Sequence, residues 1–161
     1  MTTRLSALQQ WVDEVASHTQ PDTIHWCTGS DAEYQQLIDE MQISGTLTAL
    51  NQDQYPNCYL HLSHPSDVAR VEHLTFICTE KEKDAGPNNH WMSPAEGHAK
   101  VDALFKNVMR GRTLYVIPYC MGPIDSPYAR CGVEITDSPY VVINMKLMTR
   151  MGSAALARIE R

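Results

Sequence analysis

The run Thr113-Leu114-Tyr115-Val116-Ile117-Pro118-Tyr119 decides the fold class of this chain. It is rich in β-branched and aromatic side chains, which favour β-strands. The apolar run from Leu114 to Met121 is broken by Pro118 and is far shorter than the roughly 20 residues that cross a bilayer. We therefore expect a central strand of a buried sheet here.

Further strands and helices alternate on both sides of this run. Apolar residues at helical spacing predict a helix over residues 4–17, and cap or stop signals at Ser30, Gly45, Ser93, Gly111 and Ser138 mark three more. Short β-branched or aromatic runs predict strands over residues 24–27, 46–50, 58–62, 75–79 and 132–136. This order predicts an α/β fold, a mixed β-sheet flanked by helices, in a single domain over residues 1–161.

The last predicted helix, residues 140–150, is apolar on more than one side. Its side chains include Val141, Val142, Met145 and Met148. We expect it to be buried, either in the core or beneath a partner surface, with the methionine-rich residues 141–151 as the apolar patch.

Composition excludes several classes of protein. The 161 residues carry 19 acidic and 13 basic side chains, for a net charge of -6, which argues against a nucleic-acid-binding surface or a polybasic membrane anchor. The first residues lack the apolar stretch of a secretory signal. We expect a soluble, cytoplasmic protein that binds neither nucleic acid nor membrane.

The five cysteines form an odd set without a C-x-x-C pair: Cys27, Cys58, Cys78, Cys120 and Cys131. A secreted disulfide framework more often has an even count in a shorter chain, so reduced thiols are expected. Four of the five lie in apolar runs, where cysteine behaves as a small core residue.

Motifs that hold phosphates or metals are absent. The sequence contains no G-x-x-x-x-G-K-[ST], no H-E-x-x-H and no G-x-S-x-G. Cys58, His61 and His64 are the nearest approach to a metal cluster, but on a strand positions 58 and 61 face opposite sides and no fourth ligand follows. We expect no metal-binding, cofactor-binding or catalytic residue on this chain alone.

Arg70 is a candidate for binding an anion. It follows a Pro-Ser-Asp turn, where a guanidinium group can offer a planar fork to a carboxylate or phosphate. The alternative is a surface ion pair with Asp67 or Glu72. Arg110 and Arg112, at the end of a predicted helix, are interpreted as structural.

An ordered set of motifs resembles the N-terminal part of the GTP-dependent phosphoenolpyruvate carboxykinases. The motifs are Pro56–Leu60, Pro65–Glu72, Thr75–Cys78, Asp84–Asn89 with Trp91-Met92, Met109–Pro118, Met121-Gly122-Pro123 with Ser126-Pro127, Gly132–Val142 and Met148–Gly152. Together they cover most of the chain in order.

The resemblance implies the fold of that family's N-terminal domain and a part in one reaction. Family enzymes convert oxaloacetate and GTP into phosphoenolpyruvate, GDP and carbon dioxide in gluconeogenesis, with Mn²⁺ or Mg²⁺. By its place in Ser66-Asp67-Val68-Ala69-Arg70, Arg70 would bind the carboxylate of oxaloacetate or phosphoenolpyruvate. The family's nucleotide-binding and metal-binding residues lie in a C-terminal domain that this sequence lacks, so GTP and metal are expected only in the full-length enzyme.

Three hypotheses follow for the function. The first is an N-terminal carboxykinase domain that is inactive alone. The second is a free-standing anion-binding or interaction module of the same lineage, working with a separate partner chain. The third, an α/β domain without chemistry, would require the ordered motifs to match by chance.

Overall fold

A computed structural model describes residues 3–64, 67 and 71–161 of the chain. The chain forms two compact units. The first joins residues 1–62 to residues 109–161, and the second comprises residues 63–108. The single domain expected over residues 1–161 stays a prediction, and each unit is described by itself.

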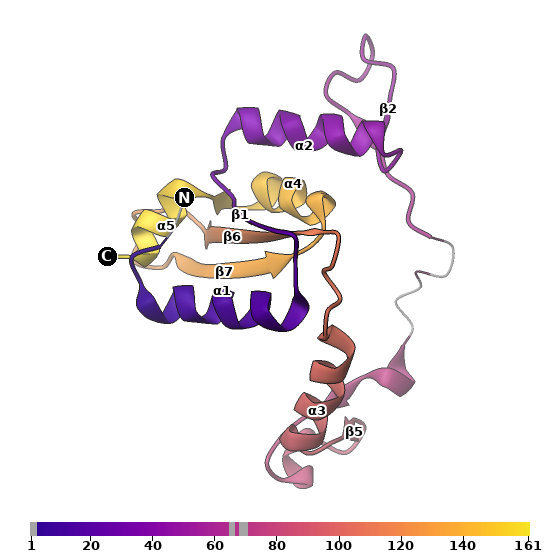
Figure 1. Ribbon diagram of the computed structural model, residues 1–161, viewed down its shortest axis with the longest axis vertical. Coiled ribbons are helices and arrows are strands. Elements are labelled where there is room, and N and C mark those ends of the chain that lie inside the picture. Colours follow the sequence, from indigo (N-terminus) through magenta and orange to yellow (C-terminus); the bar gives the residue numbers. More distant parts are fainter. Residues whose placement is uncertain (1–2, 65–66, 68–70) are drawn as a thin grey trace. The chain divides into compact units, whose positions relative to one another are not determined.

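The first unit is built on a mixed sheet (Figure 1). Strand β6 (Thr113–Met121) pairs in parallel with β1 (Thr23–Trp26) and antiparallel with β7 (Arg130–Thr136) and β8 (Arg150–Met151). Residues 114–118 of β6 are all buried, as expected for a strand with neighbours on both edges and helices on both faces. The predicted central strand and mixed α/β sheet are confirmed.

Helices cover both faces of this sheet (Figure 1). Leu114 and Val116 pack with α1 (Ser6–Thr19) and with Leu156 of α5 (Ser153–Ile159). Tyr115 and Ile117 point the other way, toward α2 (Asp31–Ile43) and α4 (Pro139–Met148). The alternation of side chains along a strand therefore produces two cores from one apolar run.

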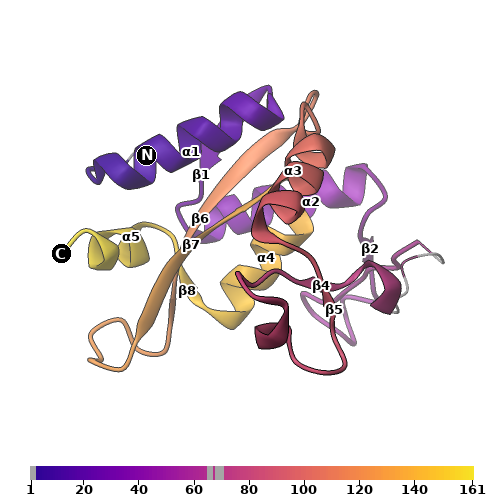
Figure 2. The ribbon, with the colours of Figure 1, turned by 90° about the horizontal axis from the view of Figure 1, so that it is seen from below.

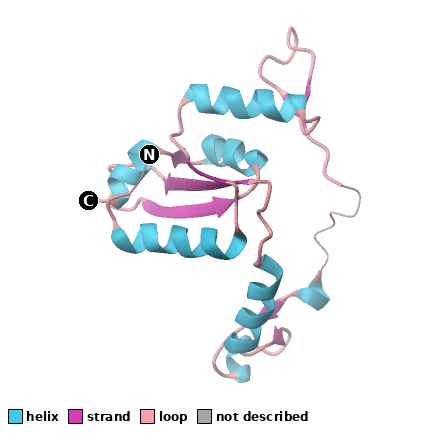
Figure 3. Ribbon diagram, viewed as in Figure 1, coloured by secondary structure: helices cyan, strands magenta, loops and turns pink. Residues whose placement is uncertain are grey.

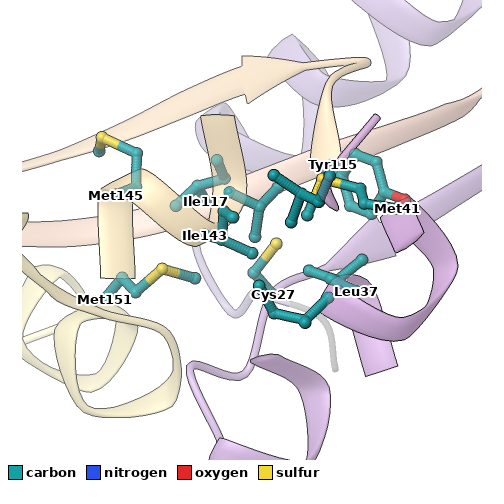
Figure 4. Close-up of a cluster of buried hydrophobic side chains, with 11 residues drawn as sticks. Cys27, Leu37, Met41, Tyr115, Ile117, Ile143, Met145 and Met151 are labelled. Carbon is teal, nitrogen blue, oxygen red and sulfur yellow. The ribbon is translucent and has the colours of Figure 1, made fainter. Parts of the chain in front are cut away.

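Figure 4 shows the core on the α2 and α4 face, where Ile117 lies beside Ile143 in one cluster with Cys27, Leu37 and Met41. Burial of α4 is confirmed for Val142, Ile143 and Met145, whereas Leu147 and Met148 are exposed. The methionine-rich residues 141–151 are thus mostly core and not one exposed apolar patch.

Serine caps begin three helices, as the sequence predicts. Ser30 accepts a hydrogen bond from Glu33 N, Ser93 from Glu96 N and Ser138 from Val141 N. Only Ser93 forms the complete reciprocal capping box. The Glu33 carboxylate does not accept a hydrogen bond from the Ser30 backbone. It accepts hydrogen bonds from Thr28 N and Gly29 N instead.

A short antiparallel ribbon follows α2. Strand β2 (Thr48–Ala49) pairs with β3 (Tyr59–Leu60), so the strands expected over residues 46–50 and 58–62 are two residues long. The sequence predicted neither β8 nor α5, because each is short and depends on packing against β6.

The second unit contains η1 (Glu72–Leu74), β4 (Phe76–Ile77), η2 (Glu82–Ala85), β5 (His90–Trp91) and α3 (Pro94–Phe105). Figure 3 distinguishes its helices from its strands. Strands β4 and β5 are parallel. The only buried apolar side chains among its described residues are Ala85 and Met92.

Helix α3 differs from its prediction in two ways. It ends at Phe105, well before Gly111, and Asn107 then adopts a positive φ of 60°. Val101, Leu104, Phe105 and Val108, whose helical spacing predicts a face packed on the core, are exposed. The described residues of the second unit leave that apolar face uncovered.

Among the described residues, none of the helices combines the length and the apolar character required to cross a lipid bilayer.

Candidate functional site

Arg70, the predicted substrate-binding residue, lies outside the described residues, but both of its flanks are described. Before it, the backbone N–H of Asp67 donates to His64 O at 2.8 Å. After it, Leu74 N donates to Val71 O at 2.8 Å, where η1 begins. The described residues on both sides of Arg70 belong to the second unit, and the 3₁₀ helix η1 begins at Glu72.

A hollow of about 250 Å³ in the second unit begins at the residue that follows Arg70. It is lined by Val71, Glu72, Thr75, Asn88, Asn89 and His90. Amide, hydroxyl and imidazole groups can donate hydrogen bonds to the oxygens of an anion. The Glu72 carboxylate would repel an anion and attract a guanidinium group, so the hollow suits a site whose positive charge comes from an arginine.

Hydrogen bonds from side chains to backbone carbonyls hold two of the residues that line this hollow. Asn89 Nδ2 donates to Ala85 O at 2.6 Å across the turn at Gly86, whose φ is 85°. The Thr75 hydroxyl donates to Val71 O at 3.0 Å. Neither contact was visible in the sequence, although Asp84–Asn89 is one of the motifs that carry the family resemblance.

A second cluster, His25, Cys27 and Glu33, lies in the first unit. Its potential ligand atoms all fall within 4.8 Å of one another, and it is the one such group of three within the described ranges. His25 Nε2 lies 2.7 Å from Glu33 Oε1, and Thr28 N and Gly29 N donate to the same carboxylate at 2.8 to 3.0 Å.

This cluster does not fit the divalent metal of the carboxykinase family. Burial, and then the nearby Glu33 charge, raise the pKa of the Cys27 thiol to about 12. Mn²⁺ and Mg²⁺ prefer oxygen ligands, and the carboxylate oxygens of Glu33 are already taken by Thr28, Gly29 and His25. The arrangement is that of a structural clamp at the start of α2.

Cys58 and His61, which with His64 are the nearest approach to a metal cluster in the sequence, make other contacts in the structure. His61 Nδ1 lies 2.8 Å from Thr46 O, and the ring stacks on Tyr140 with centroids 4.2 Å apart. The Cys58 thiol donates to Pro56 O at 3.7 Å. These two side chains stabilise the β2–β3 ribbon and its contact with α4.

Arg112, which we interpret from the sequence as a structural residue, forms an ion pair within the first unit. Arg112 Nη1 donates to Asp137 Oδ2 at 2.5 Å, and thereby joins the start of β6 to the segment before α4. Beside it, Gly111 N donates to Asp22 Oδ1 at 2.9 Å.

Comparison with known proteins places these features in a family. The model of the phosphoenolpyruvate carboxykinase N-terminal domain matches residues 10–161, a range that includes Arg70 and every residue of the hollow. The chain belongs to the phosphoenolpyruvate carboxykinase N-terminal domain family.

Among curated relatives, phosphoenolpyruvate carboxykinase (GTP) of Chlamydia trachomatis serovar D is 54% identical over 154 residues, 96% of this chain and 26% of the relative. The protein of the same name from Anaeromyxobacter dehalogenans is 54% identical over 92% of this chain and 25% of its own length. That from Chlamydia caviae is 56% identical over 92% and 25%. The carboxykinase domain described here thus spans about a quarter of the length of the relatives it matches.

Proposed function

We propose that this chain is the substrate-side portion of a GTP-dependent phosphoenolpyruvate carboxykinase, in which Arg70 binds a carboxylate of oxaloacetate or phosphoenolpyruvate. The observation that carries the proposal is the family match over residues 10–161, together with relatives that all bear that name. The reaction would release carbon dioxide from oxaloacetate and transfer a phosphoryl group from GTP.

The role of Arg70 would be positioning and electrostatic. A bidentate arginine fixes the plane of a carboxylate, which orients the bond that must break during decarboxylation. The hollow from Val71 to His90 supports this role, because it provides hydrogen-bond donors and includes Val71, which follows Arg70 in the sequence. Glu72 or Asp67 would pair with Arg70 when substrate is absent.

We propose further that GTP and Mn²⁺ or Mg²⁺ bind to the part of such an enzyme that this chain does not span, so that the chain alone is inactive. Phosphoryl transfer requires cationic groups around the transferred phosphoryl, and His25, Cys27 and Glu33 do not fit that metal. The exposed apolar residues of the second unit, including Leu104 at 77% exposure, support a surface that packs on the remaining part.

Calorimetric titration of phosphoenolpyruvate and of oxalate into this chain tests the substrate half-site. We expect weak binding, on the order of millimolar Kd, that is lost in Arg70→Ala and kept in Arg110→Ala, a matched exposed arginine. Binding that survives Arg70→Ala would contradict the role of Arg70.

A chimaera tests the same residue in a working enzyme. This chain replaces the matching quarter of the Chlamydia trachomatis relative, with which it is 54% identical. Arg70→Ala should lower kcat/KM for phosphoenolpyruvate by about a hundredfold, and Arg110→Ala should leave it unchanged. An equally active Arg70→Ala chimaera would overturn the proposal.

A further inference from the structure

Cys120 and Cys131 lie directly opposite each other on neighbouring antiparallel strands. The register of β6 and β7 places Tyr119 against Gly132, Cys120 against Cys131 and Met121 against Arg130. Figure 2 shows these strands side by side, joined by a loop at one end. Ten residues separate the two cysteines in the sequence, so their pairing depends on the register alone.

The hydrogen bonds of β6 decide which kind of pair this is. Val116 O accepts from Cys27 N at 2.9 Å, and Pro118 O accepts from Gly152 N at 2.7 Å. The backbone groups of even-numbered residues in β6 therefore point away from β7, toward β1 and β8. Since these directions alternate along a strand, Cys120 and Cys131 form a non-hydrogen-bonded pair.

A non-hydrogen-bonded pair has the spacing that a disulfide requires. Such pairs bring opposite Cα atoms to about 4.5 Å, with their side chains on the same face. Disulfides form at Cα separations of about 4.4–6.8 Å. The hydrogen-bonded alternative would hold the Cα atoms about 1 Å farther apart.

The two thiols differ in their access to solvent. Cys120 is fully buried, whereas Cys131 is exposed. Burial is the largest cause of a raised pKa at Cys120, followed by a hydrogen bond with the Cys131 thiol. The register of β6 and β7 is the geometric observation that places the two cysteines opposite each other. An oxidant therefore meets Cys131 first, with Cys120 already beside it.

We propose that Cys120 and Cys131 form a reversible disulfide when the protein meets a hydroperoxide. The Cys131 thiolate attacks the peroxide O–O bond and, with one proton, yields a sulfenic acid and water for hydrogen peroxide. The Cys120 sulfur then attacks the Cys131 sulfur, the S–O bond breaks and a second water leaves. Two thiols and one peroxide thus become one disulfide and two waters, and a dithiol reductant reverses the change.

The disulfide would join β6 to β7 where the 122–129 loop begins. That loop carries Gly122, at a φ of 88°, within the Met121-Gly122-Pro123 motif. The crosslink would limit the motions of this loop and stabilise the hairpin. The three remaining thiols, Cys27, Cys58 and Cys78, would stay free.

The test is oxidation of the whole chain with one equivalent of hydrogen peroxide, followed by alkylation and mass spectrometry. Trypsin cleaves after Arg112, Arg130 and Lys146, so the disulfide would link peptides 113–130 and 131–146. We expect five alkylated thiols to become three, with this linked pair dominant and lost on reduction. Non-reducing electrophoresis should show monomer.

Two variants distinguish a specific Cys120–Cys131 disulfide from nonspecific oxidation of exposed thiols. Cys131→Ser removes the exposed member and should abolish the linked peptides, with circular dichroism to show that the variant folds. Cys78→Ser removes a different exposed thiol and should leave them unchanged. Dimers, a lasting sulfenic acid at Cys131, or five free thiols after peroxide would each overturn the proposal.

Discussion

The Nε2 atom of His25 lies 2.7 Å from Glu33 Oε1 and joins strand β1 to the first turn of helix α2. The same carboxylate accepts hydrogen bonds from Thr28 N and Gly29 N. One side chain thereby holds the whole connection between β1 and α2. The Ser30-to-Glu33 spacing predicted a helix start, but not that Glu33 would turn back to this loop.

Glu33→Gln should destabilise the chain by about 1–3 kcal/mol, because an amide replaces one of two accepting oxygens beside backbone donors. Urea unfolding followed by circular dichroism measures the change. Glu40→Gln, on the same helix but exposed, should shift stability by no more than about 0.5 kcal/mol. Equal changes in the free energy of unfolding for the two variants would contradict a stabilising role of the Glu33 hydrogen bonds.

Stability should fall as the pH is lowered below 4.5. Burial alone raises the pKa of Glu33, but the hydrogen bonds from Thr28, His25 and Gly29 outweigh it and hold the pKa below its usual 4.5. A carboxyl group with a lowered folded-state pKa stabilises the fold above 4.5 and loses that contribution as it takes up a proton in the folded state. Urea midpoints between pH 3 and pH 7 should therefore decline more steeply for the wild type than for Glu33→Gln. Parallel profiles would contradict this assignment.

Gly152→Ala should prevent the close crossing of two loops. A Cβ atom at Gly152 would lie 2.0 Å from Thr28 O, and its φ is 91°. We expect more than about 3 kcal/mol of destabilisation, or no folded protein, in thermal unfolding. Gly45→Ala is the matched control, since Gly45 also has a positive φ, 75°, but meets no atom within 4 Å. Gly45→Ala should lower the free energy of unfolding by only about 1–2 kcal/mol.

Ile117→Ala should lower the free energy of unfolding by about 2–5 kcal/mol. Ile117 is fully buried in the core on the α2 and α4 face, and truncation of its side chain leaves a cavity (Figure 4). Ile43→Ala removes the same atoms from a side chain that is 88% exposed, at the end of α2. That control should change the free energy of unfolding by about 0.5 kcal/mol or less. Chemical denaturation of both variants provides the comparison.

Thiol reactivity should divide the cysteines by burial. With native, freshly reduced protein, an alkylating reagent at neutral pH should label Cys58, Cys78 and Cys131 rapidly and Cys27 very slowly. The thiolate is the reactive form, and the pKa of Cys27 is raised to about 12. Rapid labelling of Cys27 in a protein with an unchanged circular-dichroism spectrum would contradict its place in the core.

The sequence expectations about cysteine were half correct. Cys27 and Cys120 are core residues, as expected for cysteines in apolar runs, but Cys58, Cys78 and Cys131, the second residue of β7, are exposed. An apolar neighbourhood in sequence predicts burial only when both faces of a strand are covered. The first two residues of β7, Arg130 and Cys131, are exposed to solvent. The neighbouring residues in the sequence do not indicate this exposure.

The sequence by itself determined the features that depend on a few consecutive residues. Ser30, Ser93 and Ser138 mark helix starts because a cap and the N–H that it accepts lie three residues apart. The ordered motifs likewise indicated the carboxykinase family, which the family match over residues 10–161 confirms. The substrate-binding role of Arg70 stays a prediction.

Only the tertiary structure decided which distant residues meet. It placed Cys120 against Cys131, brought Gly152 onto Thr28, and left the apolar residues of α3 exposed in the part of the chain that is described. These outcomes depend on strand register and helix packing, which are set by the summed burial of many side chains far apart in the chain. No short stretch of sequence contains that information.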